Sequence, residues 1–555
     1  MRMKTRFAAL AAIAAVGALL PATASAQGGT VLFNSQVNMT APPPPAGQVD
    51  NFPQNKQNEP GIARDPQTGA LIAGSNDEID EPLCRTSATG TGACPFAPNV
   101  GTSGVYFSLD RGVHWTQPSF TESASGVGSC EGRVIHTLPG YCEQNLESLG
   151  DPNLAVGPAR GSDGRFSLAN GSVVYYANLA MAASGAGLPS ISISRSIDDG
   201  ASWKAPVTVS TSSDNPVDFN DKINVWADAN PKSPFFGNVY ASWTLFIGAG
   251  RFGKSNTFEP EPIVFARSTD GGQTWSRIIR LSQSANNGTV GGRQGSLIRS
   301  GPDGTVYVMW KGAINQHSEQ LLAVSHDGGA TFGGPMPVAA VNDIPSPLGG
   351  SSFRDNSFPS ADVNQQTGAL YVVWANEEST PPTALIKFTE SDDGGLSWTT
   401  PKTVGGAAGA VNAFFPSVAA SPDGANVFVA WPAQTWKANG TPPGAGVVSQ
   451  FAAFQLRSHG VWGGAHLLST AFGDPDGSST NSLGAQFLGD YATAVADNST
   501  GWFVWSDTRN EAACSAVDAF RAGTAPRPNP DTACPPSASG QLFGNSDIFV
   551  GAVGF

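Results

Sequence analysis

Acidic residues stand close to short apolar runs at several places in this sequence. Glu59, Asp151 and Asp490 each lie two or three residues before such a run, and Asp77 follows one. When carboxyl groups are held near one another their pKa values are pushed apart, so that one donates a proton while another accepts one or attacks. Hydrolysis of a glycosidic bond needs this chemistry. We therefore predict that these four residues are catalytic.

Other residue types near the same positions could contact a substrate. Tyr491 follows Asp490 directly, and Arg293, Arg354 and Arg509 stand where strands are expected to begin or end. An arginine fork suits the binding of anionic groups. A structural interpretation stays open for each residue, because Asp or Asn before a strand often caps a turn. The prediction therefore rests on the whole set of polar residues rather than on any one member.

Five octamers of one pattern recur along the chain and would fix the positions of these residues. They are Ser108–Trp115, Ser196–Trp203, Ser268–Trp275, Ser325–Phe332 and Ser391–Trp398. Each reads S-x-D-x-G-x-(T/S/H)-(W/F). Asp accepts hydrogen bonds from backbone N–H groups ahead of it and Gly adopts a positive φ, so the octamer predicts a tight turn between two strands. Repetition of this kind indicates a repeat architecture.

The octamer resembles the Asp box of the sialidase superfamily of β-propellers, which includes sialidases, other glycosidases and non-catalytic proteins. The resemblance implies an all-β fold, a β-propeller of four-stranded blades, in which the Asp-box aspartates are structural. Sialidases carry an R-I-P arginine motif on the first strand, where this chain has Glu59-Pro60-Gly61-Ile62. An acidic residue at that place would repel sialic acid, so the resemblance predicts the fold more than the activity.

Seven pairs of apolar runs can be followed along the chain, each giving the first two strands of a blade. Seven blades are therefore favoured over six, the number found in sialidases. The run Thr30–Phe33 is expected to close the ring by joining the C-terminal blade at Ile548–Val553, because such closure hides sheet edges. The octamers would join third and fourth strands, which places the acidic strand starts on the opposite face.

The N-terminus has the three parts of a secretory signal peptide. A basic segment with Arg2, Lys4 and Arg6 precedes the apolar run Phe7–Leu20 and the cleavage motif Ala24-Ser25-Ala26. No later run is long and apolar enough to cross a membrane. The expected division is a signal peptide at 1–26 cut after Ala26, a lead-in with the closing strand at 27–57, and the propeller at 58–555. We expect a secreted, extracellular monomer.

The cysteines agree with an exported protein. They are Cys84, Cys94, Cys130, Cys142, Cys514 and Cys534. Disulfides are expected in that setting, and pairing of sequence neighbours is the simplest of the possible connectivities. All six fall in loops of the face that carries the acids, where they could wall a cleft. Protection of long loops against proteolysis explains them equally well.

The net charge and the absence of metal-binding motifs argue against several other functions. A formal net charge of −14 argues against a nucleic-acid partner. The sequence has neither H-E-x-x-H nor C-x-x-C, so no metal and no cofactor is expected. The segment Asp474-Pro475-Asp476-Gly477 could donate oxygen ligands to calcium, but it lacks the remaining ligand spacing and is interpreted as a turn.

Two functions stay open on these grounds, and a glycan or glycoconjugate is the expected partner. The first is a hydrolase of non-sialic glycans that uses the carboxyl groups at the strand starts. The alternative is a non-catalytic propeller that binds glycan or protein on the same face, and a true exo-sialidase is less favoured than either. A hydrolase requires two carboxyls about 5 to 10 Å apart across a pocket, whereas a binding module would show a flatter face with exposed aromatic side chains.

Overall fold

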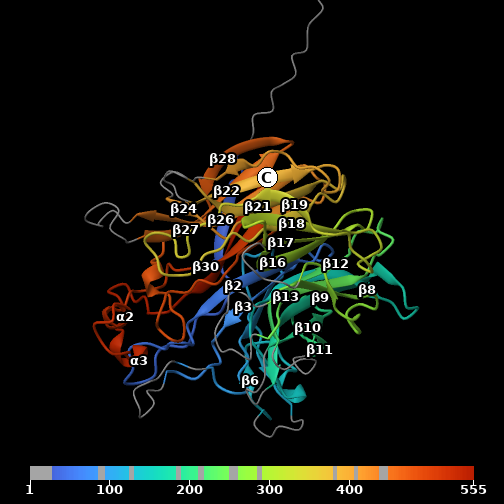
Figure 1. Cartoon of the computed structure of the whole chain (residues 1–555). Helices are drawn as coiled ribbons and strands as arrows, with labels where there is room; N and C mark the ends of the chain where they lie inside the picture. Colours follow the sequence, from blue (N-terminus) through green and yellow to red (C-terminus); the bar gives the residue numbers. More distant parts are fainter. Residues whose placement is uncertain are drawn as a thin grey trace, which may run out of the picture.

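The computed structural model describes residues 28–84, 94, 96–123, 130–182, 189–210, 218–248, 260–283, 290–378, 384–405, 411–436 and 448–555. The predicted signal peptide, residues 1–26, lies outside the described residues. The strands are grouped in sheets around a common centre, as in a β-propeller (Figure 1). The prediction of an all-β propeller is confirmed.

Five separate sheets have the size of a single blade. The first contains β2 (Gln57–Arg64), β3 (Leu71–Asp77) and β4 (Ser103–Ser108). The second contains β7 (Leu146–Ser148), β8 (Asn153–Arg160), β9 (Phe166–Ala182), β10 (Ser190–Ser196) and β11 (Lys204–Ser210). The third contains β12 (Phe219–Ala227), β13 (Val239–Phe246), β14 (Ile263–Ser268) and β15 (Ile279–Arg280). The fourth contains β16 (Val290–Ser300), β17 (Val306–Ile314), β18 (His317–Ser325) and β19 (Met336–Ala340). The fifth contains β29 (Thr493–Ala496), β30 (Thr500–Asp507), β31 (Asp547–Gly554) and β1 (Thr30–Gln36).

One larger sheet corrects the predicted number of blades. It has nine strands: β20 (Ser360–Val363), β21 (Leu370–Glu377), β22 (Ala384–Ser391), β23 (Lys402–Val404), β24 (Asn412–Ala413), β25 (Ser417–Ala420), β26 (Asn426–Trp436), β27 (Val448–Ser458) and β28 (Val461–Leu467). The expected count of seven blades, or six, is not met, because the structure shows five separate blades. The physical reason is β24, which pairs parallel with β22 and antiparallel with β26 and so joins two groups of strands.

The remaining elements are short. They are β5 (Phe120–Thr121), β6 (Val134–Ile135), the 3₁₀ turns η1 (Cys142–Gln144) and η2 (Pro475–Gly477), and the helices α2 (Ser515–Arg521) and α3 (Pro530–Ala533). Both helices lie in the connection between β30 and β31, which is drawn in red at one side of the molecule in Figure 1. None of the helices in the described residues is long and apolar enough to cross a membrane.

The two ends of the chain meet in one sheet. β1 pairs antiparallel with β31, with Thr30 opposite Gly554 and Gln36 opposite Phe549. β31 also pairs with β30 along its other edge. The N-terminal strand therefore covers an edge of β31 that would otherwise expose unpaired backbone groups.

The centre of the molecule is a cavity of about 530 Å³. Its lining includes residues of β2, β8, β12, β16, β20, β25 and β29. Tryptophans of the next strands outward fill the space between the sheets: Trp243, Trp310, Trp374, Trp431 and Trp505 are at most 1% exposed. Burial of such large aromatic surfaces is the main source of stability in a fold of this type. The inner strands are thus held firmly around the central cavity.

All five octamers form the same turn. In Ser268–Trp275, the Ser268 hydroxyl donates to Asp270 at 2.8 Å, and Asp270 accepts from the backbone N–H of Thr274 at 2.9 Å and its hydroxyl at 2.6 Å. Corresponding bonds to Asp occur at Asp110, Asp198, Asp327 and Asp393. Hydrogen bonds from Thr331 hold the pKa of Asp327 at about 2. These aspartates are turn residues, as the sequence indicates, and they lie outside the central cavity.

The cysteines are paired as sequence neighbours, as expected. The bonds are Cys84–Cys94, Cys130–Cys142 and Cys514–Cys534. The first and third share a buried apolar cluster with Phe52, Val517 and Phe543. The segment that carries α2 and α3 is therefore packed against the N-terminal lead-in, with Val49 N–H donating to the Asp531 carbonyl at 2.8 Å.

This packed region buries two carboxyl groups. Asp50 and Asp531 are both 0% exposed. Burial raises the pKa of Asp50 to about 7. Burial and then the charge of Asp50 raise the pKa of Asp531 to about 7. Both groups therefore retain a proton in the folded state at a pH at which they lose it in the unfolded chain.

We expect the free energy of unfolding to fall as pH rises from 4 to 8. Unfolded Asp has a pKa of about 3.9 and the folded groups titrate near 7, so the stabilisation is complete below the lower value and is lost through the upper one. Asp531→Asn should reduce this fall by about 3 kcal/mol, measured by urea unfolding across the pH range. Asp392→Asn, at an exposed carboxyl, is the control. An unchanged pH dependence in Asp531→Asn would contradict the account.

Candidate functional site

The inner strands share an unusual backbone feature near their starts. Glu59, Asp151, Lys222 and Phe415 all have φ between 43 and 55°, and Gly295 has φ 68°. A positive φ is unfavourable for residues other than glycine and is retained where the surroundings enforce it, often at functional sites. In β2, β12 and β16 the same position coincides with a shift in strand register. The chain therefore repeats one local distortion around the central cavity.

This distortion helps to gather charged side chains at one end of the inner strands. We call them the inner cluster: Glu59, Asp151, Asp221, Lys222, Arg354, Asp490 and Tyr491. Glu59 lies in β2 and Asp221 and Lys222 lie in β12, whereas the others precede β8, β20 and β29. Five members were predicted from the sequence as site residues. The structure brings these five together.

Asp151 is the centre of a chain of three carboxyl groups. It shares hydrogen bonds with the side chains of Glu59 and Asp221, and its Oδ2 accepts from the backbone N–H of Lys222 at 3.2 Å. Burial and then the charge of Asp151 raise the pKa values of Glu59 and Asp221 well above their ordinary range. Burial also opposes ionisation of Asp151, but the hydrogen bonds from Glu59 and Asp221 outweigh it and lower its pKa. Asp151 is therefore ionised between two protonated carboxyls.

Arg354 and Asp490 form a two-pronged ion pair. Arg354 Nε donates to Asp490 Oδ1 at 2.7 Å and Nη2 donates to Oδ2 at 2.6 Å. The same Nη2 lies 3.7 Å from Glu59 Oε1. The Arg354 side chain is 59% exposed, whereas that of Glu59 is 2% exposed. The guanidinium thus links a buried acid to a second acid at the solvent boundary.

Lys222 and Tyr491 complete the inner cluster. Lys222 Nζ lies 3.3 Å from the centre of the Tyr491 ring, a cation–π contact. The Tyr491 hydroxyl donates to the Pro152 carbonyl at 3.3 Å. Burial, followed by the charges of Asp151 and Glu59, raises the pKa of Tyr491 well above its ordinary range. Tyr491 is therefore a neutral phenol and a poor nucleophile in this setting.

The inner cluster is open to small molecules through two cavities. One of about 200 Å³ is lined by Glu59, Asp151 and Arg354 together with Phe96 and Phe487. The other, of about 80 Å³, is lined by residues that include Lys222, Asp490 and Tyr491. Arg354 stacks on Phe487, with 4.9 Å between the guanidinium and the ring centre. The cavities therefore combine acids, one exposed cation and aromatic walls.

Three predicted residues lie outside the inner cluster. Asp77 is 0% exposed and accepts from Tyr106 at 2.7 Å and Gln57 at 2.9 Å, so it serves the packing of the first blade. Arg293 is 3% exposed, and its Nε donates to the Glu261 carbonyl at 3.1 Å. Arg509 donates from Nε and Nη2 to Asp507, at 2.8 Å each. None of the three lines either cavity of the inner cluster.

The predicted catalytic and substrate-binding residues did not include Asp221 or Lys222. A signal was present in the repeat itself: Glu59, Asp151 and Lys222 each stand three residues before an apolar position of the inner strand, at Ile62, Leu154 and Val225. An alignment of the repeats in that register would have placed Lys222 beside the two acids. Lys222 was not predicted because the expected chemistry called for carboxyl groups.

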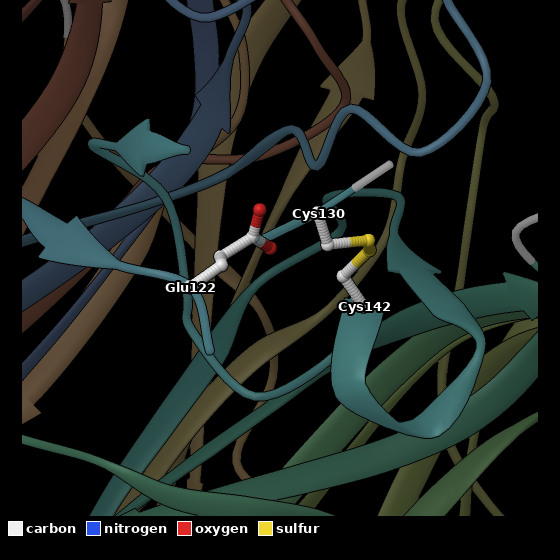
Figure 2. Close-up of side chains that lie close together, drawn as sticks. All are labelled: Glu122, Cys130 and Cys142. Carbon is white, nitrogen blue, oxygen red and sulfur yellow. A yellow bond between two sulfur atoms is a disulfide. The ribbon is translucent and has the colours of Figure 1, made fainter. Parts of the chain in front are cut away.

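In the described residues, three side chains of types that can bind metals lie close together away from the inner cluster. Glu122 lies near Cys130 and Cys142, as Figure 2 shows. The two sulfur atoms are joined in a disulfide and are not thiolates, and Glu122 accepts from Arg133 Nε at 2.7 Å. The thiolate is the form of cysteine that binds metals. These three side chains therefore do not form a metal site in the oxidised protein.

The fold and site define an all-β propeller with a buried acidic cluster near its centre. No family model matches the chain, and no curated protein matches it. Solved structures with a similar fold include the Penicillium chrysogenum alpha-L-arabinanase complexed with arabinobiose, at 13% identity and TM-score 0.41 over 72% of this chain and 94% of that one. They also include the Hadza microbial sialidase Hz136, at 14% identity and TM-score 0.38 over 68% and 63%. At these values the likeness says nothing about the residues or activity of this chain.

The charge balance of the inner cluster leads to a prediction. Lys222→Met keeps most of the side-chain volume but removes the positive charge that favours the ionised form of Asp151. We expect a loss of about 2 kcal/mol in unfolding free energy, because removing one partner of a buried pair leaves the other charge uncompensated. Urea unfolding at neutral pH measures it, with the exposed Lys232→Met as control. Equal stability of both variants would show that Lys222 does not neutralise the cluster.

Proposed function

We propose that the inner cluster is the active site of a secreted glycoside hydrolase. The observation that carries the proposal is the pairing of a protonated, buried Glu59 with Asp490 across one guanidinium nitrogen. The distances of 3.7 and 2.6 Å from Arg354 Nη2 put the two carboxyl oxygens at most about 6.3 Å apart. Retaining glycoside hydrolases use carboxyls about 5.5 Å apart, one as the acid and the other as the nucleophile.

The residues divide the chemistry by their environments. Glu59 holds its proton because of burial and the neighbouring Asp151, so it serves as the general acid toward the leaving oxygen. Asp490 is the nucleophile. The side-chain amide of Asn356 donates from Nδ2 to the backbone carbonyl of Asp490 at 2.9 Å and so helps to orient it. After the leaving group departs, the ionised Glu59 takes a proton from the water that attacks the glycosyl–Asp490 bond, which frees Asp490 and restores the acid. Asp151 accepts the hydrogen bond that holds the Glu59 proton in place. Arg354 and Tyr491 contact the substrate.

A neutral glycan fits this site better than a sialylated one. Lys222 and Arg354 already face Asp151 and Asp490, which leaves little positive charge for a substrate carboxylate. Arg293 and Arg509, which could have completed an anion clamp, are engaged elsewhere. A true exo-sialidase is therefore the less favoured activity. The three disulfides support secretion, and a monomer is the simplest assembly.

A non-catalytic glycan-binding protein is the second candidate. Arg354 and Asp490 already pair with each other within the inner cluster. Phe96, which is 54% exposed, offers a stacking surface at the rim of the larger cavity. Aromatic faces and a fixed ion pair suit binding without bond cleavage. The two candidate functions differ in whether Glu59 gives up a proton and Asp490 forms a bond to the sugar when the glycan is bound.

Sugar release from a panel of neutral and sialylated glycans tests the proposal. Glu59→Gln and Asp490→Asn should each lower kcat/KM by about 10²- to 10⁴-fold with folding retained, because each removes one half of the acid–nucleophile pair. Activity of the unchanged protein should fall as pH rises through the raised pKa of Glu59, since the acid form is lost.

Asp392→Asn, in an exposed turn, is the matched control and should keep full activity. Full activity in Glu59→Gln would refute the assigned role. Binding of neutral glycans without any release would favour the second candidate, and release of sialic acid alone would overturn the choice of substrate.

A further inference from the structure

Glu511 carries a carboxyl group that the protein buries without a partner. Its side chain is 1% exposed, and neither Oε1 nor Oε2 has a hydrogen-bond partner among the residues that the structure describes. Buried polar groups are almost always paired, and an unpaired carboxylate in a protein interior is strongly unfavourable. The position of Glu511 therefore calls for a compensating group.

Asp474 stands beside Glu511. The backbone N–H groups of both residues donate to the same carbonyl, that of Thr508, at 3.2 and 3.1 Å. Both side chains line one polar cavity of about 310 Å³, and Ser449, Ser537 and Gln541 contribute to the same wall. Two carboxyl groups and several neutral oxygens thus face a common space. This space is separate from the cavities of the inner cluster.

The cations of the protein in this region are used elsewhere. Arg521, the positive charge that acts on Glu511, donates to the backbone carbonyls of Asp476, Ser478, Leu483 and Ala485. Arg509 is held by both oxygens of Asp507. Two further buried oxygens of the surrounding segments, Gln450 Oε1 and Thr508 Oγ1, also have no hydrogen-bond partner in the described part of the chain. The region is thus rich in oxygen acceptors.

We propose that Glu511 and Asp474 bind a divalent cation of the calcium type in this cavity. Calcium takes carboxylate, carbonyl and hydroxyl oxygens in flexible geometry, and two carboxylates balance its charge. Glu511 supplies both oxygens and Asp474 supplies the second carboxylate, with neutral oxygens of the wall and water completing the coordination. Asp474 opens the Asp474–Gly477 segment, for which the sequence predicts a turn.

The cation would stabilise a segment that reaches the inner cluster. The chain runs from Asp474 to Asp490, and Gln486 Nε2 donates to Asp476 Oδ1 at 2.6 Å. Arg521 fixes the middle of this segment through its four backbone contacts. Binding at Asp474 therefore secures one end of a segment whose other end carries Asp490.

The experiment compares thermal unfolding of the full-length purified protein after removal of metals by a chelator. Calcium chloride at about 1 mM should raise Tm by about 2 °C or more, whereas sodium chloride of equal ionic strength should not. Titration calorimetry should show one calcium ion per chain. Absence of both the Tm rise and the binding heat would overturn the proposal. An equal response to magnesium chloride would overturn the assignment to calcium.

Two variants locate the ion without reference to enzymatic activity. Glu511→Gln removes the charge at constant shape and should lose the calcium-dependent Tm rise, and Asp474→Asn should weaken calcium binding by at least about tenfold. Glu131→Gln, at an exposed carboxyl, should respond as the unchanged protein does. Should Glu511→Gln fail to fold, Asp474→Asn decides alone. A full calcium response in Asp474→Asn would refute the site.

Discussion

The inner cluster depends on one constraint: four carboxyl groups share a small space with only two cations. Protonation resolves the excess, because Glu59 and Asp221 keep their protons while Asp151 between them is ionised. Asp151 then faces Lys222, and Asp490 faces Arg354. The arrangement is neutral as a whole, which makes burial of so many polar groups tolerable. Any role in catalysis would depend on this difference in pKa between the protonated carboxyl groups and Asp151.

The rest of the structure holds this balance in place. Large tryptophans fix the sheets, and the inner strands start with a left-handed residue or a shift in register where the cluster forms. The long connection after β30 packs its helices and a disulfide against the lead-in. Through Arg521 it also holds the segment that delivers Asp490. Backbone strain at the site is thus offset by packing elsewhere.

The fold was accessible from the sequence because its evidence is local. The octamers specify their own turns, and apolar runs between them specify strands, so the propeller class follows from residues close together in the chain. The separation of blades did not follow, because the pairing of Asn412 and Ala413 with two neighbouring strands is a tertiary event. For the site, the location of Glu59, Asp151 and Asp490 near the starts of inner strands was enough to predict that these three residues lie close together. It failed for Arg293 and Arg509, whose partners Glu261 and Asp507 are chosen by packing.

The repeated left-handed position also bears on how such a molecule could change over evolutionary time. Glutamate, aspartate, lysine, glycine and phenylalanine occupy it in different repeats, at Glu59, Asp151, Lys222, Gly295 and Phe415. The backbone there accommodates very different side chains, so a single codon change can exchange the chemistry offered to the centre without a new loop. Gly295 shows the limit, because a Cβ there would come within 2.4 Å of the Phe358 ring. The residue types that this position can accept are therefore limited by neighbouring side chains more than by the fold.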